Sequence, residues 1–273
     1  MDIPKNNKRA DLVYKSTKAR ELMLTFIPPE VKKYERAPVY FIIPGGGWQV
    51  EKREDMLAFS ARSSKKLGLE GFATVAIDYR TSPEGVVMKD IICDCFDAAR
   101  YISHFSDILE IDRDSFVFSG HSAGGHLALM LSYAPQENFE DGYEFCDKFT
   151  PKAAAPMSPP TILYDNNTHN LRDIGVNFAG CDTRKMREYT SPITYAGKNS
   201  CPTLLAAGTS DYLVFASSSE RLYDKLTKEK AKCVLVLSVG GGHCFEKINR
   251  GVSPSISFDE IQDIISEFIL KQF

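Results

Sequence analysis

One fifteen-residue stretch, FVFSGHSAGGHLALM at positions 116–130, strongly limits how this chain can fold. It joins a run of β-favouring residues directly to a run of helix formers, with small residues at the junction. A strand that ends at Ser119 and passes at once into a helix leaves room only for a sharp turn with Ser122 at its apex. Gly120 and Gly124 flank the serine at positions where a side chain would collide with neighbouring backbone. The stretch therefore predicts a strand–turn–helix unit that presents the Ser122 hydroxyl at the end of a sheet.

The rest of the chain alternates short apolar runs with amphipathic helical patterns, which favours an α/β fold with a mostly parallel sheet covered by helices. Six runs are predicted to form strands buried on both faces, at residues 38–43, 73–78, 115–119, 153–157, 203–208 and 233–239. Apolar residues at helical spacing predict covering helices over 91–102 and 261–269. Two earlier alternating runs, 10–16 and 21–27, predict an antiparallel hairpin at one edge of the sheet.

Composition narrows the classes of function. The 273 residues are 43% hydrophobic, enough for one globular domain over residues 1–273 with a buried core. A net charge of -3 gives no basic field that would attract nucleic acid or anionic lipid. No stretch approaches the roughly 20 apolar residues of a membrane span, and the first residues carry no apolar signal region, so we expect a cytoplasmic protein with no nucleic-acid or membrane partner. The seven cysteines are odd in number and lack metal-ligand spacing, so we expect buried reduced thiols and no metal site.

A polar segment at about 158–190 interrupts the alternation, between the predicted strands at 153–157 and 203–208. Insertions of this size above a sheet usually form a lid or a specificity element. We therefore predict a small cap or lid here. The alternative is a solvated helical connection without a role in binding.

A serine alcohol is a weak nucleophile, so it needs a nearby base that a third group orients. His243, in VLVLSVGGGHCF, follows a buried run and three glycines that let the loop fold back toward the turn at Ser122, so we predict that it is the base. The alternative is a buried histidine that makes only structural hydrogen bonds. The other four histidines are predicted to pack, to cap or to lie at the surface: His104, His121, His126 and His169.

The orienting acid is predicted at the end of another strand. Asp211, in PTLLAAGTSDYLV, meets this requirement, and the order Ser122, Asp211, His243 is the one found with this kind of turn. The alternative for Asp211 is a turn residue that caps the next helix. Weaker candidates for the acid are Asp182, Glu246 and Asp78. We expect Asp78 to support the loop around Arg80 instead.

The stretch FIIPGGGWQV contributes a third feature of the predicted site, a glycine-rich loop after a predicted strand. The glycines at 45–47 allow close approach of backbone, and N–H groups there, with that of Ala123, can stabilise an oxyanion. A phosphate-binding loop is the competing interpretation, but the stretch has neither a Gly-Lys-Ser/Thr ending nor Gly-x-Gly-x-x-Gly spacing. Trp48 and Tyr212 are candidate substrate-binding residues, although aromatic residues near strand ends are as often part of the core.

Together these motifs resemble the α/β-hydrolases of the hormone-sensitive-lipase-like and carbohydrate-esterase-like branch, which includes acetyl esterases and xylanase-associated esterases. The resemblance covers residues 38–270 and rests on six motifs in order: PGGGW, DYRTSPEG, GHSAGGHLA, SPITY, PTLLAAGTSDYLV and GGGHCF. It implies an eight-stranded sheet with a short lid after the sixth strand. It also implies the site residues, namely Ser122 as nucleophile, Asp211 as acid, His243 as base, and the N–H groups of Gly46, Gly47 and Ala123 as the oxyanion hole. The chain departs from the family pattern at Pro44, where a histidine is usual, and proline can brace the loop by fixing φ.

The resemblance and the turn predict a serine carboxylic-ester hydrolase that forms an acyl-enzyme on Ser122. The short insertion favours small, acetyl-like acyl groups, with acetylated sugars among the candidate substrates. An arylformamidase, or a small-peptide or amide hydrolase with the same three residues, is the alternative enzyme, and a non-catalytic binding module is the alternative outside enzymes. We expect a small-molecule ester as partner and no cofactor, and the last strand and helix could form the edge of a homodimer.

Overall fold

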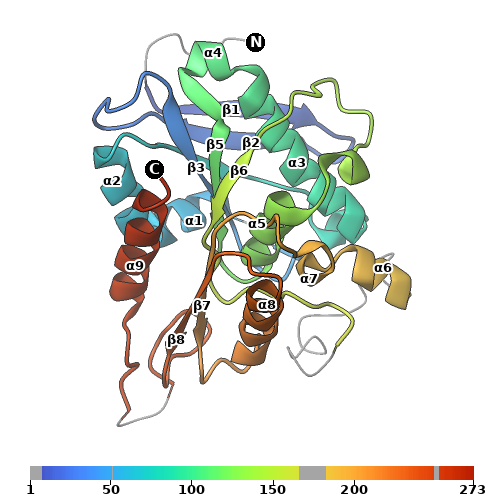
Figure 1. Cartoon of the computed structure of the whole chain (residues 1–273). Helices are drawn as coiled ribbons and strands as arrows, with labels where there is room; N and C mark the ends of the chain where they lie inside the picture. The colour runs from blue at the N-terminus through green and yellow to red at the C-terminus, as the bar shows by residue number, and fades with distance from the viewer. Residues whose placement is uncertain (1–7, 51, 166–182, 249–251) are drawn as a thin grey trace.

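A computed structural model describes residues 8–50, 52–165, 183–248 and 252–273 of the chain (Figure 1). An eight-stranded sheet runs through its centre in the order β1-β2-β4-β3-β5-β6-β7-β8. The strands are β1 (Ala10–Ser16), β2 (Glu21–Ile27), β3 (Ala37–Ile43), β4 (Ala73–Ile77), β5 (Ile111–Gly120), β6 (Pro151–Ala154), β7 (Thr203–Gly208) and β8 (Cys233–Ser238). β2 runs antiparallel to both β1 and β4, and the other neighbouring pairs are parallel. The predicted edge hairpin and the mostly parallel eight-stranded sheet are therefore confirmed.

Helices cover both faces of the sheet, as the apolar spacing predicts (Figure 1). The α-helices in the described part of the chain are α1 (Arg53–Phe59), α2 (Ala61–Leu69), α3 (Met88–His104), α4 (Ser106–Leu109), α5 (Ala123–Tyr133), α6 (Arg184–Tyr189), α7 (Pro192–Tyr195), α8 (Ala216–Lys228) and α9 (Phe258–Leu270). Along β3, Val39 and Phe41 belong to the core that α3 and α5 cover, whereas Tyr40 and Ile42 belong to the core that α2 and α9 cover. None of the helices described is long and apolar enough to cross a membrane.

Three strands differ from the prediction. β5 begins at Ile111, four residues before the predicted start, and its first half is partly exposed. β8 is not buried on both faces, because it lies at the edge of the sheet, where Val234 is 39% exposed. β6 ends at Ala154, although Met157 still forms a bridge to His121. The chain then turns at Ser158, whose φ is 45°. A homodimer across the β8 edge stays a prediction.

Six cysteines lie in the described part of the chain, and all are free thiols. Cys93 and Cys95 are buried as predicted, and burial raises the pKa of Cys93 to about 12. Cys201 and Cys233 are half-buried, and Cys146 and Cys244 are exposed in surface loops, so the prediction of buried thiols holds only for Cys93 and Cys95. Cys181 lies outside the described residues.

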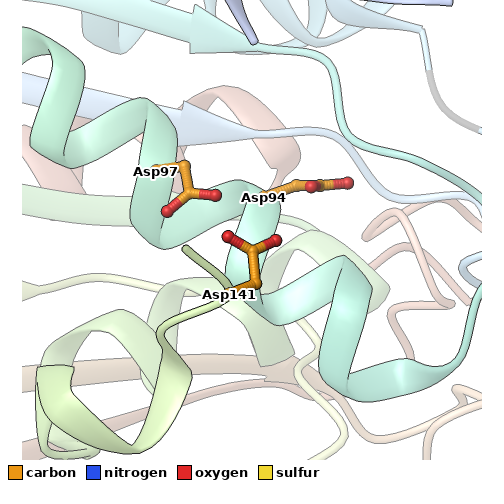
Figure 2. A group of neighbouring side chains, drawn as sticks. All are labelled: Asp94, Asp97 and Asp141. Atoms are coloured by element: carbon orange, nitrogen blue, oxygen red, sulfur yellow. The ribbon is translucent and has the colours of Figure 1, made fainter. Parts of the chain in front are cut away.

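Ion pairs fasten the edge hairpin to α3. The Lys15 ammonium on β1 lies among three carboxylates, at 2.9 Å from Asp94, 2.6 Å from Asp97 and 2.6 Å from Asp141. Figure 2 shows Asp94 and Asp97 projecting from one helix, with Asp141 turned toward them from a separate segment. The three carboxylates are close enough together to hold a metal ion, but here Lys15 supplies the positive charge.

A two-point ion pair extends this network to the loop after β4. Arg80 donates Nε and Nη2 to the carboxylate of Asp94, both at 2.7 Å. Asp78 is not the partner of Arg80 but accepts a hydrogen bond from Arg53 at 3.0 Å. Asp78 also lies 3.7 Å from Arg20, which donates to the Tyr79 carbonyl oxygen, so its predicted support of the loop around Arg80 stays a prediction. Within the network, burial raises the pKa of Asp97 to about 6.

Candidate active site

The turn at Ser122 has the strained geometry that the sequence predicts. β5 ends at Gly120 and α5 begins at Ala123, and Ser122 between them has φ 55° and ψ -121°. A Cβ atom at Gly120 would lie 2.5 Å from the backbone of Gly124, and a Cβ atom at Gly124 would lie 1.9 Å from the carbonyl oxygen of Ile43. Side chains do not approach backbone so closely, so this turn requires both glycines. The strand–turn–helix unit is confirmed.

We expect Gly124→Ala to lower the predicted ester hydrolysis by about 100-fold or more, because an error of about 1 Å in the position of a reacting group costs on that order. The added methyl group must push α5 away from the end of β3. Gly197→Ala is the matched control, since its Cβ meets no atom within 4 Å, and it should keep the wild-type rate. Initial rates with a nitrophenyl acetate, together with circular dichroism, measure the effect. A wild-type rate for Gly124→Ala would show that the turn tolerates the clash.

His243 and Asp211 form a short hydrogen bond at the end of the sheet, where Nδ1 of the imidazole donates to Oδ2 of the carboxylate at 2.6 Å. Asp211 follows β7 and its carboxylate is fully buried, whereas His243 follows β8 with 12% of its side chain exposed. The other carboxylate oxygen, Oδ1, accepts the N–H groups of Leu213 and Val214 at 2.9 and 3.0 Å. One carboxylate oxygen therefore orders a turn that precedes α8 without capping it, and the other bonds to His243. The role of Asp211 as the orienting acid stays a prediction.

The turn at Ser122 meets the His243 loop through the residue before the serine. The ring centroids of His121 and His243 lie 4.6 Å apart, and Nε2 of His121 donates to the His243 carbonyl oxygen at 2.9 Å. No hydrogen bond among the described residues joins the Ser122 hydroxyl to the His243 ring. Bonds of this kind are often long without substrate and shorten when it binds. The structure thus brings Ser122, His243 and Asp211 to one edge of the sheet with the histidine–aspartate bond already formed.

The glycine loop after β3 packs directly against this turn. A Cβ atom at Gly45 would lie 2.7 Å from the carbonyl oxygen of His121. Gly46 and Gly47 have φ 121° and 63°, which glycine adopts readily and other residues rarely do. Over the ranges that the structure describes, the N–H groups of Gly46, Gly47 and Ala123 have no acceptor in the protein. Unpaired donors beside a serine are what an oxyanion hole needs.

Tyr79 braces the glycine loop, since its hydroxyl donates to the carbonyl oxygen of Pro44 at 2.8 Å. Trp48 anchors the same loop in the core, because it is fully buried and its indole N–H donates to Nδ1 of His126 at 3.3 Å. The side chain therefore offers no surface to a substrate, which corrects the prediction for Trp48. Tyr212 is 59% exposed beside Asp211 and stays a candidate for substrate binding.

The remaining candidates take other roles. Glu246 accepts a backbone N–H at 2.7 Å and so orders the turn that follows the base. His104 lies at the surface and His126 is buried in α5, as predicted for both. Asp182 and His169 lie outside the described residues. No motif in the sequence indicates the contact between His121 and His243.

Solved structures share the fold. An esterase from Thermogutta terrifontis with propionate bound has a TM-score of 0.79 at 23% identity, and the match covers 98% of this chain and 96% of that chain. The esterase 2 of the same organism, phosphonylated by sarin, has a TM-score of 0.81 at 23% identity, with 96% and 94% covered. The sheet order and the strained serine turn, with this likeness, define the α/β-hydrolase fold. The BD-FAE family model matches residues 24–226, so the chain belongs to the BD-FAE family.

Curated relatives are longer than this chain. A probable isoprenylcysteine alpha-carbonyl methylesterase from Oryza sativa subsp. japonica is 26% identical over 232 residues, which are 80% of this chain and 54% of the relative. The probable carboxylic ester hydrolase LipM from Mycobacterium tuberculosis is 27% identical over 206 residues, which are 72% of this chain and 47% of the relative. The chain thus spans about half the length of these relatives.

Proposed function

We propose that the chain is a serine carboxylic-ester hydrolase that works through an acyl-enzyme on Ser122. The observation that carries the proposal is the 2.6 Å hydrogen bond between His243 and Asp211 next to the strained serine turn. The unpaired N–H groups of the glycine loop support it, because they can hold the negative charge of a tetrahedral intermediate. Relatives and structural neighbours named as esterases or ester hydrolases support it as well.

The reaction runs in two halves. First, Nε2 of His243 accepts the Ser122 proton as the serine oxygen attacks the ester carbonyl carbon, and the N–H groups of the glycine loop and of Ala123 stabilise the oxyanion. Collapse breaks the bond to the alcohol oxygen, which takes the proton from His243. Water then gives its proton to His243 and attacks the acyl carbon, and the serine oxygen leaves with that proton while the acid is released. Asp211 keeps the imidazole oriented in both halves.

Small acyl groups suit the space beside this site. A cavity of about 270 Å³ adjoins the glycine loop and the serine turn, and Gly46, Met56, Phe59 and His121 are among the residues that line it. Sites for drug-sized ligands are commonly about 300–1,000 Å³, so this cavity is small. We therefore propose acetyl-like esters, with acetylated sugars among them, as substrates. The lid predicted at about 158–190 falls largely on residues outside those described and stays a prediction.

A panel of nitrophenyl esters tests the acyl preference. We expect kcat/KM for the acetyl ester to exceed that for the decanoyl ester by about tenfold or more, with butyryl between them, because methylene groups that the cavity cannot enclose contribute no binding. Faster turnover of the decanoyl ester would contradict the proposal. An acetylated sugar and N-formylkynurenine complete the panel, and hydrolysis of the formamide faster than every ester would favour the arylformamidase alternative.

A further inference from the structure

The backbone of His243 is held by two side chains from different parts of the fold. Its carbonyl oxygen accepts hydrogen bonds from Nε2 of His121 and from Oγ of Ser158, both at 2.9 Å. His121 belongs to the turn that carries Ser122, and Ser158 follows the bridge at Met157, just beyond β6. One carbonyl group therefore ties the loop of the proposed base to the turn of the proposed nucleophile.

The ring of His121 also packs against the imidazole ring of His243. The two rings lie 4.6 Å apart between centroids at 57°, and the ring of Phe59 packs on His121 at 4.9 Å. Because a carbonyl oxygen only accepts, Nε2 of His121 carries its proton. Burial and the neighbouring His243 lower the pKa of His121 to about 4, so this ring stays neutral and does not repel the imidazolium that forms during catalysis.

The loop of His243 needs such support. Gly240, Gly241 and Gly242 precede the histidine, and glycine leaves the backbone many conformations. Ser158, one of the two donors, has φ 45°, a left-handed conformation that costs a non-glycine residue about 1–2 kcal/mol. A glycine would avoid this cost but would lack the hydroxyl that reaches the carbonyl oxygen of His243.

We infer that His121 and Ser158 are positioning residues that place the His243 imidazole over Ser122 by holding the His243 carbonyl oxygen, an inference that rests on the proposed function. Neither residue touches the reacting atoms in this scheme. Their effect is on the geometry of proton transfer, so it should appear in kcat. Substrate binding should stay nearly unchanged when Ser158 is replaced, whereas His121 also lines the proposed acyl cavity.

Single and double variants test the inference. His121→Phe and Ser158→Ala each remove one donor, and we expect each to lower kcat for a nitrophenyl acetate by about tenfold and the pair by about 100-fold. KM should stay nearly constant for Ser158→Ala, which lies outside the cavity lining. The rate of labelling by a fluorophosphonate should fall in parallel. The downfield proton resonance of His243 Nδ1–H should broaden in the double variant, because the ring loses its fixed orientation. His121→Gln keeps an N–H donor and should restore most of kcat.

Ser119→Ala is the matched control, since this buried serine also donates to a backbone carbonyl oxygen, that of Ala155 at 2.7 Å, and does not touch His243. A double variant with wild-type kcat, or losses no larger than those of Ser119→Ala, would overturn the inference. If His121→Phe does not fold, Ser158→Ala and Ser158→Gly decide by the same criteria. If Ser122→Ala retains full activity, the proposed function fails instead, so the two failures are distinguishable.

Discussion

Replacing Ser122 by alanine is expected to lower kcat for a nitrophenyl acetate by about 10⁴- to 10⁶-fold, the range seen when the nucleophile of a serine–histidine–aspartate site is removed. The substitution deletes the attacking oxygen and leaves the hydrogen bond between His243 and Asp211 in place. Some rate above that of water should remain, because the oxyanion donors still bind the substrate carbonyl group. A fluorophosphonate should add once to the wild type, and intact-mass measurement should find no adduct on Ser122→Ala.

Ser132→Ala is the control for this experiment. Ser132 is a buried serine of α5 whose hydroxyl donates to the Ala128 carbonyl oxygen at 2.7 Å, away from the proposed site. It should keep both the wild-type rate and the adduct. Undiminished hydrolysis by Ser122→Ala would assign the nucleophile elsewhere, and a wild type that forms no adduct would support the non-catalytic binding module.

The serine turn can be predicted from the sequence because its requirements are local. Gly120 and Gly124 lie within two residues of Ser122, and the clash that excludes other residues follows from the turn itself. Asp211 and His243 can be predicted for a different reason. The carboxyl ends of parallel strands meet at one edge of a sheet, so polar residues that follow such strands approach one another whatever their separation in sequence.

Contacts between other distant segments cannot be predicted in this way. A single sequence shows that His121 precedes the serine, but not that its ring lies against a residue 122 positions away. The partner of Arg80 is likewise supplied by Asp94 of α3 and not by the carboxylate nearest to it in sequence. Trp48 is an aromatic residue of the kind that can line a pocket. Only its packing against His126 shows that the side chain faces inward. These features depend on how helices and loops pack over the sheet.

Replacing Lys15 by methionine is expected to lower the free energy of unfolding by about 1.5–3 kcal/mol, the usual effect of losing a hydrogen-bonded partner of a charged group. Methionine keeps much of the apolar stem and removes the ammonium group that three carboxylates share. Asp94 and Asp97 are fully buried, and they keep their arginine partners but lose the cation between them. Asp141 is partly exposed and can regain water, so most of the loss should come from the two buried groups.

The loss of unfolding free energy in Lys15→Met is expected to be largest at neutral pH and to become smaller in mild acid. Burial already raises the pKa of Asp97 to about 6, and loss of the Lys15 charge raises it further, so the native variant binds a proton that the unfolded chain releases. A carboxyl group with a raised native pKa costs stability at neutral pH, and this cost is lost progressively as the pH falls from the native pKa to the unfolded-state pKa of about 4. Urea unfolding at neutral pH and in mild acid measures the difference in free energy of unfolding between the variant and the wild type.

Lys32→Met, which removes an exposed ammonium 2.8 Å from Glu110, is the matched control and should unfold like the wild type. An unchanged midpoint for Lys15→Met, or a gap that stays constant in acid, would contradict the role of Lys15 as the cation of this network.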